Sequence, residues 1–310
     1  MAELARAFAP ATVGNVAVGF DILGFAVKEI GDIVSVKKIS EPQNIKIEKI
    51  TGASGIPTDP KKNTATVGLI RLAKDFNLPF GFSVSIEKGI PLSSGMGGSA
   101  ASAVAAVVAA NALLPKPLDE TALFSYALDG ESLASGSMHG DNLAPALLGG
   151  LVLVQSVKPF EFVQIPVPKN IICVLVHPHI EIETRTARKI LKKDVSLKEH
   201  VHQSSLLAGF ISGCFLNDKA VISRSLKDHL IEPQRSSLIP GFTEAQSAAL
   251  NSGAFGCSIS GAGPTVFAWT DSRSSGEKIA DNMKRAFQKN GTEKVDSWIS
   301  PIRTEGAALI

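Results

Sequence analysis

The sequence contains few cysteines, few aromatic residues and no excess of charge of either sign. Its three cysteines, Cys173, Cys214 and Cys257, are odd in number and far apart, which excludes a disulfide framework. We expect buried free thiols in a protein of the reducing cytoplasm. Lysine and arginine number 31 against 29 aspartates and glutamates. A chain so close to neutral, without a basic stripe, is not expected to bind nucleic acid.

We also expect no membrane span, no leader and no histidine metal site. Residues 101–114 form the longest run of small apolar residues, and this run is too short and too interrupted for a span of about 20 residues. The first residues show no charged region followed by an apolar core, so we expect no signal peptide and no membrane partner. The histidine pairs at 177 and 179 and at 200 and 202 do not have zinc spacing.

The length and the order of the predicted elements indicate an α+β protein of two domains. A chain of 310 residues with 45% hydrophobic side chains is long enough for two domains with a sizeable core. Strand-like and helix-like segments do not alternate strictly, and a proline-rich stretch at 160–170 marks a boundary, which predicts domains 1–165 and 166–310. The predicted strands are 33–39, 45–50, 82–86, 147–155, 171–177, 256–259, 265–270 and 294–299, and the predicted helices are 64–76, 101–114, 119–134, 184–191, 204–216 and 276–290.

The most informative segment is a glycine-rich loop between the predicted strand 82–86 and the predicted helix 101–114. Glycine lets the backbone approach phosphate oxygens closely, and the free N–H groups at the start of a helix point at them. The loop has neither the Lys-Ser/Thr end of a Walker loop nor G-x-G-x-x-G spacing, and an ordinary turn before a core helix is the alternative. The candidate phosphate-binding residues are Pro91, Leu92, Ser93, Ser94, Gly95, Met96, Gly97, Gly98, Ser99, Ala100 and Ala101.

This loop resembles the central motif of the GHMP kinases, which reads Pro-x-x-x-Gly-Leu-Gly-Ser-Ser-Ala. Met96 replaces the leucine, and Gly98 replaces the first serine of the pair, so one hydroxyl is lost. The serine that lies near magnesium in the family is present as Ser99. The resemblance implies the two-domain α+β fold of these kinases, with an N-terminal ribosomal-protein-S5-domain-2-like domain and a ferredoxin-like C-terminal domain.

Three further segments extend the resemblance along the chain. Residues 9–24 are similar to a string of the homoserine kinase branch that contains Ala-Pro, then Asn, then Gly-Phe-Asp. Residues 137–145 are similar to the string His-x-Asp-Asn-x-Ala-Pro of the same branch. Residues 260–267 look like the third family motif, a glycine loop that packs against the phosphate loop. Without the resemblance, these segments read as a hairpin with Asn15 and Asp21 as turn residues, an exposed polar loop and a tight turn between core strands.

Shorter matches follow the same order. Residues 57–65 resemble the loop on the adenine side, with Asn63 at the matching asparagine, although Asn63 is also a good helix cap. Glu131 matches the glutamate that binds magnesium, and without the resemblance it reads as a solvated helix residue. Arg188 and Arg235 lie in segments that supply two arginines to the substrate carboxylate, and each alone reads as surface charge.

The resemblance implies transfer of the γ-phosphoryl group of ATP to the side-chain hydroxyl of L-homoserine, a step of threonine biosynthesis, in a cytoplasmic homodimer. Mg²⁺ is assigned to Ser99 and Glu131, and Asn63 is assigned to the nucleotide. Asn142 cannot accept a proton, so the proton acceptor is left open between the γ-phosphate and a nearby group such as Asp21 or Asp141. The catalytic residues are Asp21, His139 and Asn142, and the substrate-binding residues are Asn15, Asp21, His139, Asn142, Arg188, Arg235 and Gly261.

Other functions on the same fold are the alternatives. A kinase for another small alcohol, such as threonine or mevalonate, is the first, and two arginines with Asp21 favour an amino acid over mevalonate, which has no ammonium group. A non-catalytic ligand sensor is the second, and the retained Ser99 and Glu131 argue against it. An ATP-dependent decarboxylase is the third, and it would form carbon dioxide.

Overall fold

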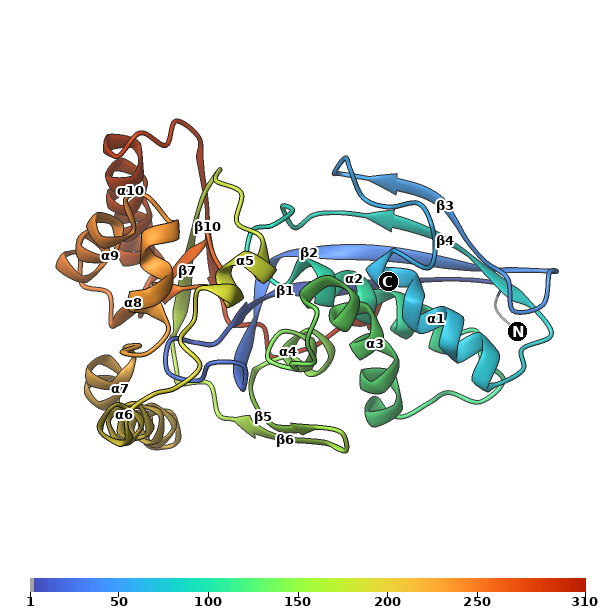
Figure 1. The fold of residues 1–310 in the computed structure, drawn as a ribbon, viewed down its shortest axis with the longest axis horizontal. Helices are drawn as coiled ribbons and strands as arrows, with labels where there is room; N and C mark the ends of the chain where they lie inside the picture. The colour runs from blue at the N-terminus through green and yellow to red at the C-terminus, as the bar shows by residue number, and fades with distance from the viewer. Residues whose placement is uncertain (1–2) are drawn as a thin grey trace.

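The larger of two β-sheets contains the strands of the first half of the chain (Figure 1). The computed structural model describes residues 3–310, except for the side chain of residue 135. The strand order is β11-β1-β2-β4-β3, with β5 beside β2 and β6 beside β5, and only β3 and β4 run parallel among these pairs. The strands are β1 (Leu4–Gly14), β2 (Leu23–Ile39), β3 (Ile45–Thr51), β4 (Gly81–Glu87), β5 (Leu151–Val157), β6 (Phe160–Ile165) and β11 (Ala308–Leu309).

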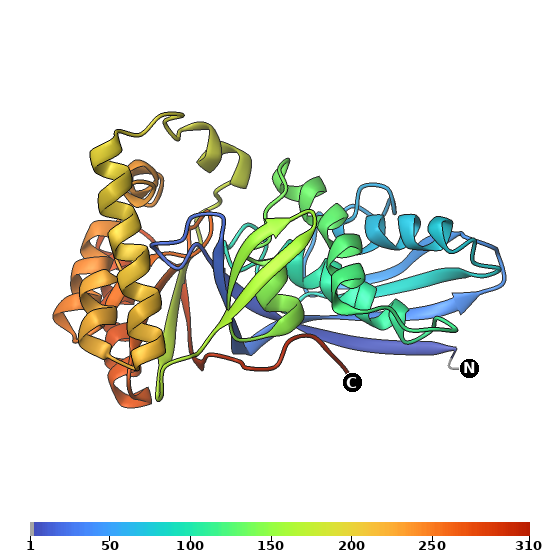
Figure 2. The same ribbon diagram turned by 90° about the horizontal axis from the view of Figure 1, so that it is seen from below.

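Helices cover one face of this sheet (Figures 1 and 2). The central helix α2 packs against β1 and β2 and is flanked by α1 and α3. Because α2 is covered on all sides, it consists almost wholly of alanine, valine, glycine and serine, which let its neighbours approach. The helices are α1 (Thr64–Asp75), α2 (Gly98–Asn111), α3 (Glu120–Ser135) and α4 (Leu143–Leu148).

The second half of the chain forms a four-stranded antiparallel sheet with the order β10-β7-β9-β8. Numbered within this half, the order is 4-1-3-2 with α10 packed on the sheet, which is the expected ferredoxin-like arrangement, and α5 to α9 lie between its first and second strands. The elements are β7 (Ile172–Pro178), α5 (Thr184–Lys189), α6 (Leu197–Leu216), α7 (Lys219–Ser225), α8 (Glu232–Arg235), α9 (Phe242–Asn251), β8 (Gly256–Ile259), β9 (Val266–Thr270), α10 (Arg273–Lys289) and β10 (Val295–Pro301).

Aromatic contacts join the two halves. The ring of Phe25 on β2 lies 5.9 Å from that of Phe267 and 5.5 Å from that of Trp269, both on β9. After β10 the chain returns to the larger sheet, where β11 pairs with β1 and the C-terminus lies alongside it (Figure 2). The expected division at residues 165 and 166 falls between β6 and β7 and stays a prediction. Residues 1 and 2 of the expected first domain lie outside the described part.

Several element bounds differ from the sequence prediction. The proline-rich stretch assigned to a boundary begins with β6, and the start of the predicted strand 147–155 belongs to α4. Helix α6 begins seven residues before the predicted position 204, because Ser196 and Glu199 form a capping box there. The cysteines are buried and free, as predicted. Within residues 3–310, no helix combines the length and hydropathy that crossing a bilayer requires.

We expect Gly68→Ala to destabilise the protein, although alanine is the better helix former. Gly68 lies where α1 meets α3, and a Cβ atom there would lie 2.3 Å from the carbonyl oxygen of Tyr126. Forcing these helices apart should lower the free energy of unfolding by about 2 kcal/mol. Urea unfolding monitored by circular dichroism measures the change. An unchanged or raised stability would show that the two helices are free to separate at no cost.

Candidate active site

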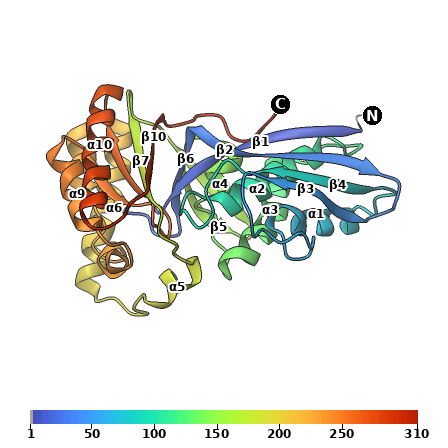
Figure 3. The same cartoon turned by 90° about the horizontal axis from the view of Figure 1, so that it is seen from above.

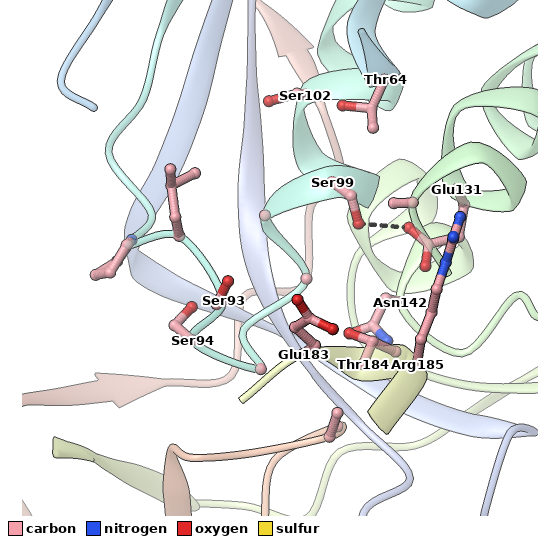
Figure 4. Close-up of a pocket in the computed structure, with 18 of the residues that line it drawn as sticks. Thr64, Ser93, Ser94, Ser99, Ser102, Glu131, Asn142, Glu183, Thr184 and Arg185 are labelled. Atoms are coloured by element: carbon pink, nitrogen blue, oxygen red, sulfur yellow. Dashed lines mark hydrogen bonds between the residues drawn. The ribbon is translucent and has the colours of Figure 1, made fainter. Parts of the chain in front are cut away.

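One cavity of about 580 Å³ is lined by residues from both halves of the chain and contains most of the predicted site residues. Figure 4 shows part of its wall, where Ser93 and Ser94 come from the loop after β4, Ser99 from α2 and Thr184 from α5. In Figure 3, α5 lies at the junction of the two halves. We call the part formed by residues 91–95, residues 97–99, Lys88 and Glu131 the phosphate-loop end. The charged end is formed by Asn15, Asp21, Arg188, Arg235 and Gly261, and between the two ends lie His139, Asp141 and Asn142.

At the phosphate-loop end, glycine geometry leaves the start of α2 open to the cavity. Gly97 is the N-cap with a φ of 67°, and no side chain caps the helix. A Cβ atom on Gly97 would lie 2.0 Å from Oγ1 of Thr12, so only glycine fits. The fully buried Met96 fixes the loop from below, and its carbonyl accepts a hydrogen bond of 3.1 Å from the Thr12 N–H. The arrangement suits an anion bound by backbone amides.

A second glycine loop, residues 260–265, docks on the phosphate loop as expected. The hydroxyl of Ser260 donates to the carbonyl of Gly95 at 2.8 Å, and the N–H of Thr265 donates to the carbonyl of Ser94 at 3.2 Å. Gly95 has a φ of +78°, and a Cβ atom there would lie 2.4 Å from the Ser260 carbonyl oxygen. The two halves of the chain therefore meet by backbone contact at this end of the cavity.

Ser99 and Glu131 point toward each other from α2 and α3 (Figure 4). The Ser99 hydroxyl donates to Oε2 of Glu131 at 2.6 Å. Burial raises the pKa of Glu131 to about 7, although the hydrogen bond from Ser99 acts in the opposite direction. A hydroxyl and a carboxylate held together beside a phosphate loop are the oxygen donors that a hard cation prefers, so this pair fits Mg²⁺.

A buried ion pair behind the loop was not predicted from the sequence. Lys88, just after β4, pairs with Asp32 of β2, and both side chains are almost wholly buried. The ammonium group also donates to the Gly98 carbonyl and the Ser102 hydroxyl, each at 2.9 Å. Asp32 occupies an inward position of its strand, like the buried Val34 two residues further on. An acidic residue at an inward strand position could have indicated a buried ion pair. The sequence does not identify its partner, because Lys88 lies 56 residues away.

Gly98, which replaces a family serine, lies against this buried pair. A Cβ atom there would lie 3.5 Å from Nζ of Lys88 and 3.4 Å from Cγ2 of Ile90, which are ordinary contacts. The missing hydroxyl thus belongs to a position that faces the lysine ammonium. The ammonium group of Lys88 still lies beside the loop although the serine hydroxyl is missing.

At the charged end, Asp21 and Arg188 form a two-pronged ion pair. Nη1 and Nη2 of Arg188 donate to the two carboxylate oxygens at 2.9 and 2.7 Å. This hydrogen bonding with Asp21 raises the pKa of Arg188. Asp21 was predicted to bind an ammonium group and Arg188 a carboxylate, and in the structure the two residues bind each other. The pair therefore has the charges of a zwitterion already in place.

Arg235 and Asn15 meet at the carbonyl of Gly261. Nη1 of Arg235 donates to this oxygen at 3.0 Å, and Nδ2 of Asn15 donates to it at 2.8 Å. Nε of Arg235 donates to the carbonyl of Ala187, which lies next to Arg188. Burial first, and then the charge of Arg188, lower the pKa of Arg235. Gly261 thus contributes its carbonyl as an anchor for two other predicted site residues.

The polar residues between the two ends come from the loop before α4. Oδ1 of Asn142 accepts a hydrogen bond of 2.8 Å from the Thr12 hydroxyl. Oxygen or nitrogen atoms of Asp21, His139 and Asp141 lie within 4.8 Å of one another. Burial lowers the pKa of His139, whereas burial and the charges of Asp21 and Glu131 raise that of Asp141 to about 7. The cluster therefore has proton-accepting capacity near neutral pH.

Some predicted residues support the cavity from behind or from its edge. Met96, Ala100 and Ala101 are buried and do not line it. Asn63 lines the cavity but uses its side chain on the chain itself, because Oδ1 accepts from the Ala65 N–H and Nδ2 donates to the Pro57 carbonyl. Its observed contacts are those of a helix cap.

Known proteins resemble the chain over its whole length. Residues 63–150 match the family described as GHMP kinases N terminal domain, and residues 211–289 match GHMP kinases C terminal. A homoserine kinase of Xylella fastidiosa (strain M12) is 50% identical over 310 residues, which cover 100% of this chain and 95% of that protein. A homoserine kinase of Chlorobium phaeovibrioides is 43% identical, with 98% of this chain and 99% of that protein covered. The crystal structure of homoserine kinase from Cytophaga hutchinsonii has a TM-score of 0.95 at 42% identity, with 100% and 98% covered.

Replacing Asp141 with asparagine should flatten the pH dependence of stability. The Asp141 carboxyl has a pKa of about 7 in the folded protein, against 3.8 for an aspartate exposed to water. In that interval the folded state holds a proton that the unfolded state has lost, so the free energy of unfolding falls as pH rises. Between about pH 4 and pH 7, the free energy of unfolding of the variant should therefore rise relative to that of the wild type by on the order of 2 kcal/mol. Urea unfolding across this range tests it, and a constant difference between the proteins contradicts it.

Proposed function

The chain belongs to the GHMP kinase family, in its homoserine kinase branch, and from this premise we propose how its cavity phosphorylates L-homoserine. The γ-phosphoryl group of ATP passes to the side-chain hydroxyl, which yields O-phospho-L-homoserine and ADP. The observation that supports the residue roles is the continuity of the cavity, in which an anion cradle adjoins an Asp–Arg pair and a second arginine. Phosphoryl transfer through a loose transition state depends mainly on positioning and on neutralising charge.

The phosphate-loop end holds the polyphosphate. The open first turn of α2 offers backbone N–H groups, and Ser93 and Ser94 bring hydroxyls to the cavity wall. The ammonium of Lys88 donates to the Gly98 carbonyl at 2.9 Å and holds the base of the loop, and Asp32 balances its charge. Asn63 shapes the edge of the adenine side by fixing Pro57 and the start of α1, rather than by a free amide.

Mg²⁺ fits between Ser99 and Glu131, where its charge would neutralise phosphate oxygens. The 2.6 Å hydrogen bond between the two side chains holds both oxygens on the same side of the cavity. The Glu131 carboxyl, with its pKa of about 7, must be ionised to act as a ligand. Metal binding would therefore release a proton from part of the population at neutral pH.

The charged end binds the amino and carboxylate groups of homoserine. Asp21 takes the ammonium group, and Arg188 and Arg235 take the carboxylate, because a planar guanidinium binds two oxygens at once. The Asp21–Arg188 pair of the free protein has to open for this exchange. Asn15 supports the arrangement by donating to Gly261 and by accepting from the Asp21 N–H at 3.0 Å.

His139 and Asn142 orient the reacting hydroxyl between the two ends. The amide of Asn142 cannot accept a proton, and its Oδ1 already accepts from Thr12. Two oxygen acceptors are available for the proton, the γ-phosphoryl group itself and the carboxylate of Asp141, whose pKa of about 7 suits that role. Asp21 is engaged by Arg188 in the free protein and by the ammonium group in the complex, so it is assigned to binding instead.

We also propose a cytoplasmic homodimer with domains 1–165 and 166–310. Three buried free thiols suit a reducing compartment. Apolar side chains exposed along α6, among them Leu197, Val201 and Leu216, support an interface. Sedimentation equilibrium measures the oligomeric state, and a monomer at every concentration would refute the dimer.

Turnover against a panel of alcohols tests the function and its rivals. ADP formation is measured with ATP, Mg²⁺ and L-homoserine, L-threonine or mevalonate, together with carbon dioxide release. Homoserine should be the preferred acceptor, with no carbon dioxide formed. Glu131→Gln serves as the matched inactive protein and should lower kcat by at least about 100-fold. Absence of homoserine-dependent ADP formation would favour a ligand sensor.

Arg188→Gln should weaken homoserine binding and leave ATP binding intact. The change removes a guanidinium from the charged end, so the KM for homoserine should rise by about 100-fold. Arg224→Gln, an exposed arginine at the end of α7, is the matched control and should behave as the wild type. Steady-state kinetics with each substrate varied in turn separate the two constants. Normal homoserine affinity in Arg188→Gln would remove this residue from the site.

A further inference from the structure

Phe20 contacts both arginines of the charged end, although it does not line the cavity. Its ring centroid lies 5.3 Å from Cζ of Arg188 and 5.1 Å from Cζ of Arg235. Both distances lie within the range of a cation–π interaction, which extends to about 6 Å. The two arginines reach this ring from different elements, α5 and α8. One half-buried side chain thus connects two cations that are far apart in the sequence.

The backbone around Phe20 is held on both sides by one residue. The N–H of Gly19 donates to the carbonyl of Asn15 at 2.8 Å, and the N–H of Asp21 donates to the Asn15 side chain at 3.0 Å. Asn15 is in turn bonded to the carbonyl of Gly261, the same oxygen that accepts from Arg235. The backbone that carries the ring is therefore tied to the same carbonyl oxygen as Arg235.

Two like charges in one small cavity need such a support. The charge of Arg188 contributes to lowering the pKa of Arg235, so the guanidinium groups repel each other. Asp21 binds Arg188 in the free protein, but under the proposed function it turns to the substrate ammonium group. The electron-rich face of an aromatic ring attracts both cations without offering a hydrogen bond that would compete with a carboxylate.

We propose that Phe20 is a positioning residue for the substrate carboxylate, which fixes the spacing of Arg188 and Arg235 through its aromatic ring. The proposal rests on the proposed function, because it assumes that the arginines bind the carboxylate of homoserine. Phe20 itself does not touch the substrate. Its effect is confined to how well two guanidinium groups are placed before the substrate arrives, and so to affinity at the charged end.

Phe20→Leu tests this role, since leucine keeps an apolar side chain and removes the ring. The KM for homoserine should rise about tenfold, while the KM for ATP stays within about twofold. Phe20→Tyr keeps the ring and should restore the wild-type KM. The alcohol 3-amino-1-propanol, which is homoserine without its carboxylate, is the discriminating acceptor. The preference for homoserine over this alcohol, as a ratio of kcat/KM values, should fall about tenfold in Phe20→Leu.

Phe80→Leu is the matched control, because Phe80 also carries a cation over its ring, Lys38 at 4.7 Å, and lies outside the cavity. It should leave both KM values unchanged. An equal fall in kcat/KM for homoserine and for 3-amino-1-propanol, or a parallel rise in the KM for ATP, would show a general structural role and overturn the proposal. An unchanged KM in Phe20→Leu would overturn it as well. A wild-type protein that does not phosphorylate homoserine would instead refute the proposed function and remove the premise.

Discussion

The contact between two glycine loops is the constraint on which the site depends. Gly95 of the phosphate loop and Ser260 of the second half approach each other so closely that a Cβ atom on Gly95 would lie 2.4 Å from the Ser260 carbonyl. This contact places the open start of α2, which belongs to the first half, beside Gly261, which anchors Arg235 and Asn15. A single cavity that joins the phosphate-loop end to the charged end follows from it.

The free site balances its charges internally. Asp21 and Arg188 pair with each other, and Lys88 and Asp32 pair behind the loop. Glu131 and Asp141 lie in surroundings that raise their pKa values to about 7, which reduces the negative charge of the empty cavity. A zwitterion and a magnesium nucleotide would then replace protein–protein charge pairs with protein–ligand pairs. Such an exchange keeps the charges of Asp21 and Arg188 paired in both states.

Local patterns predicted the parts of the site that are continuous in the chain. The strand, glycine loop and small-residue helix around Ser99 follow directly from residue spacing and from the requirement that a buried helix be apolar on all sides. The capping box before α6 was equally readable at Ser196 and Glu199, but the apolar spacing that guided the prediction becomes clear only later in that helix. The strand β6 was missed because the prolines around it suggested a linker.

The sequence by itself determined the family and the strand, glycine loop and helix around Ser99, because each is encoded in short segments whose geometry is local. Only the tertiary structure decided the partners: Asp32 with Lys88, Asp21 with Arg188, and Phe20 with both arginines. These contacts join residues that are 56 to 215 positions apart. They depend on how β2 pairs with β4 and on how the two halves of the chain pack, rather than on any spacing along the chain.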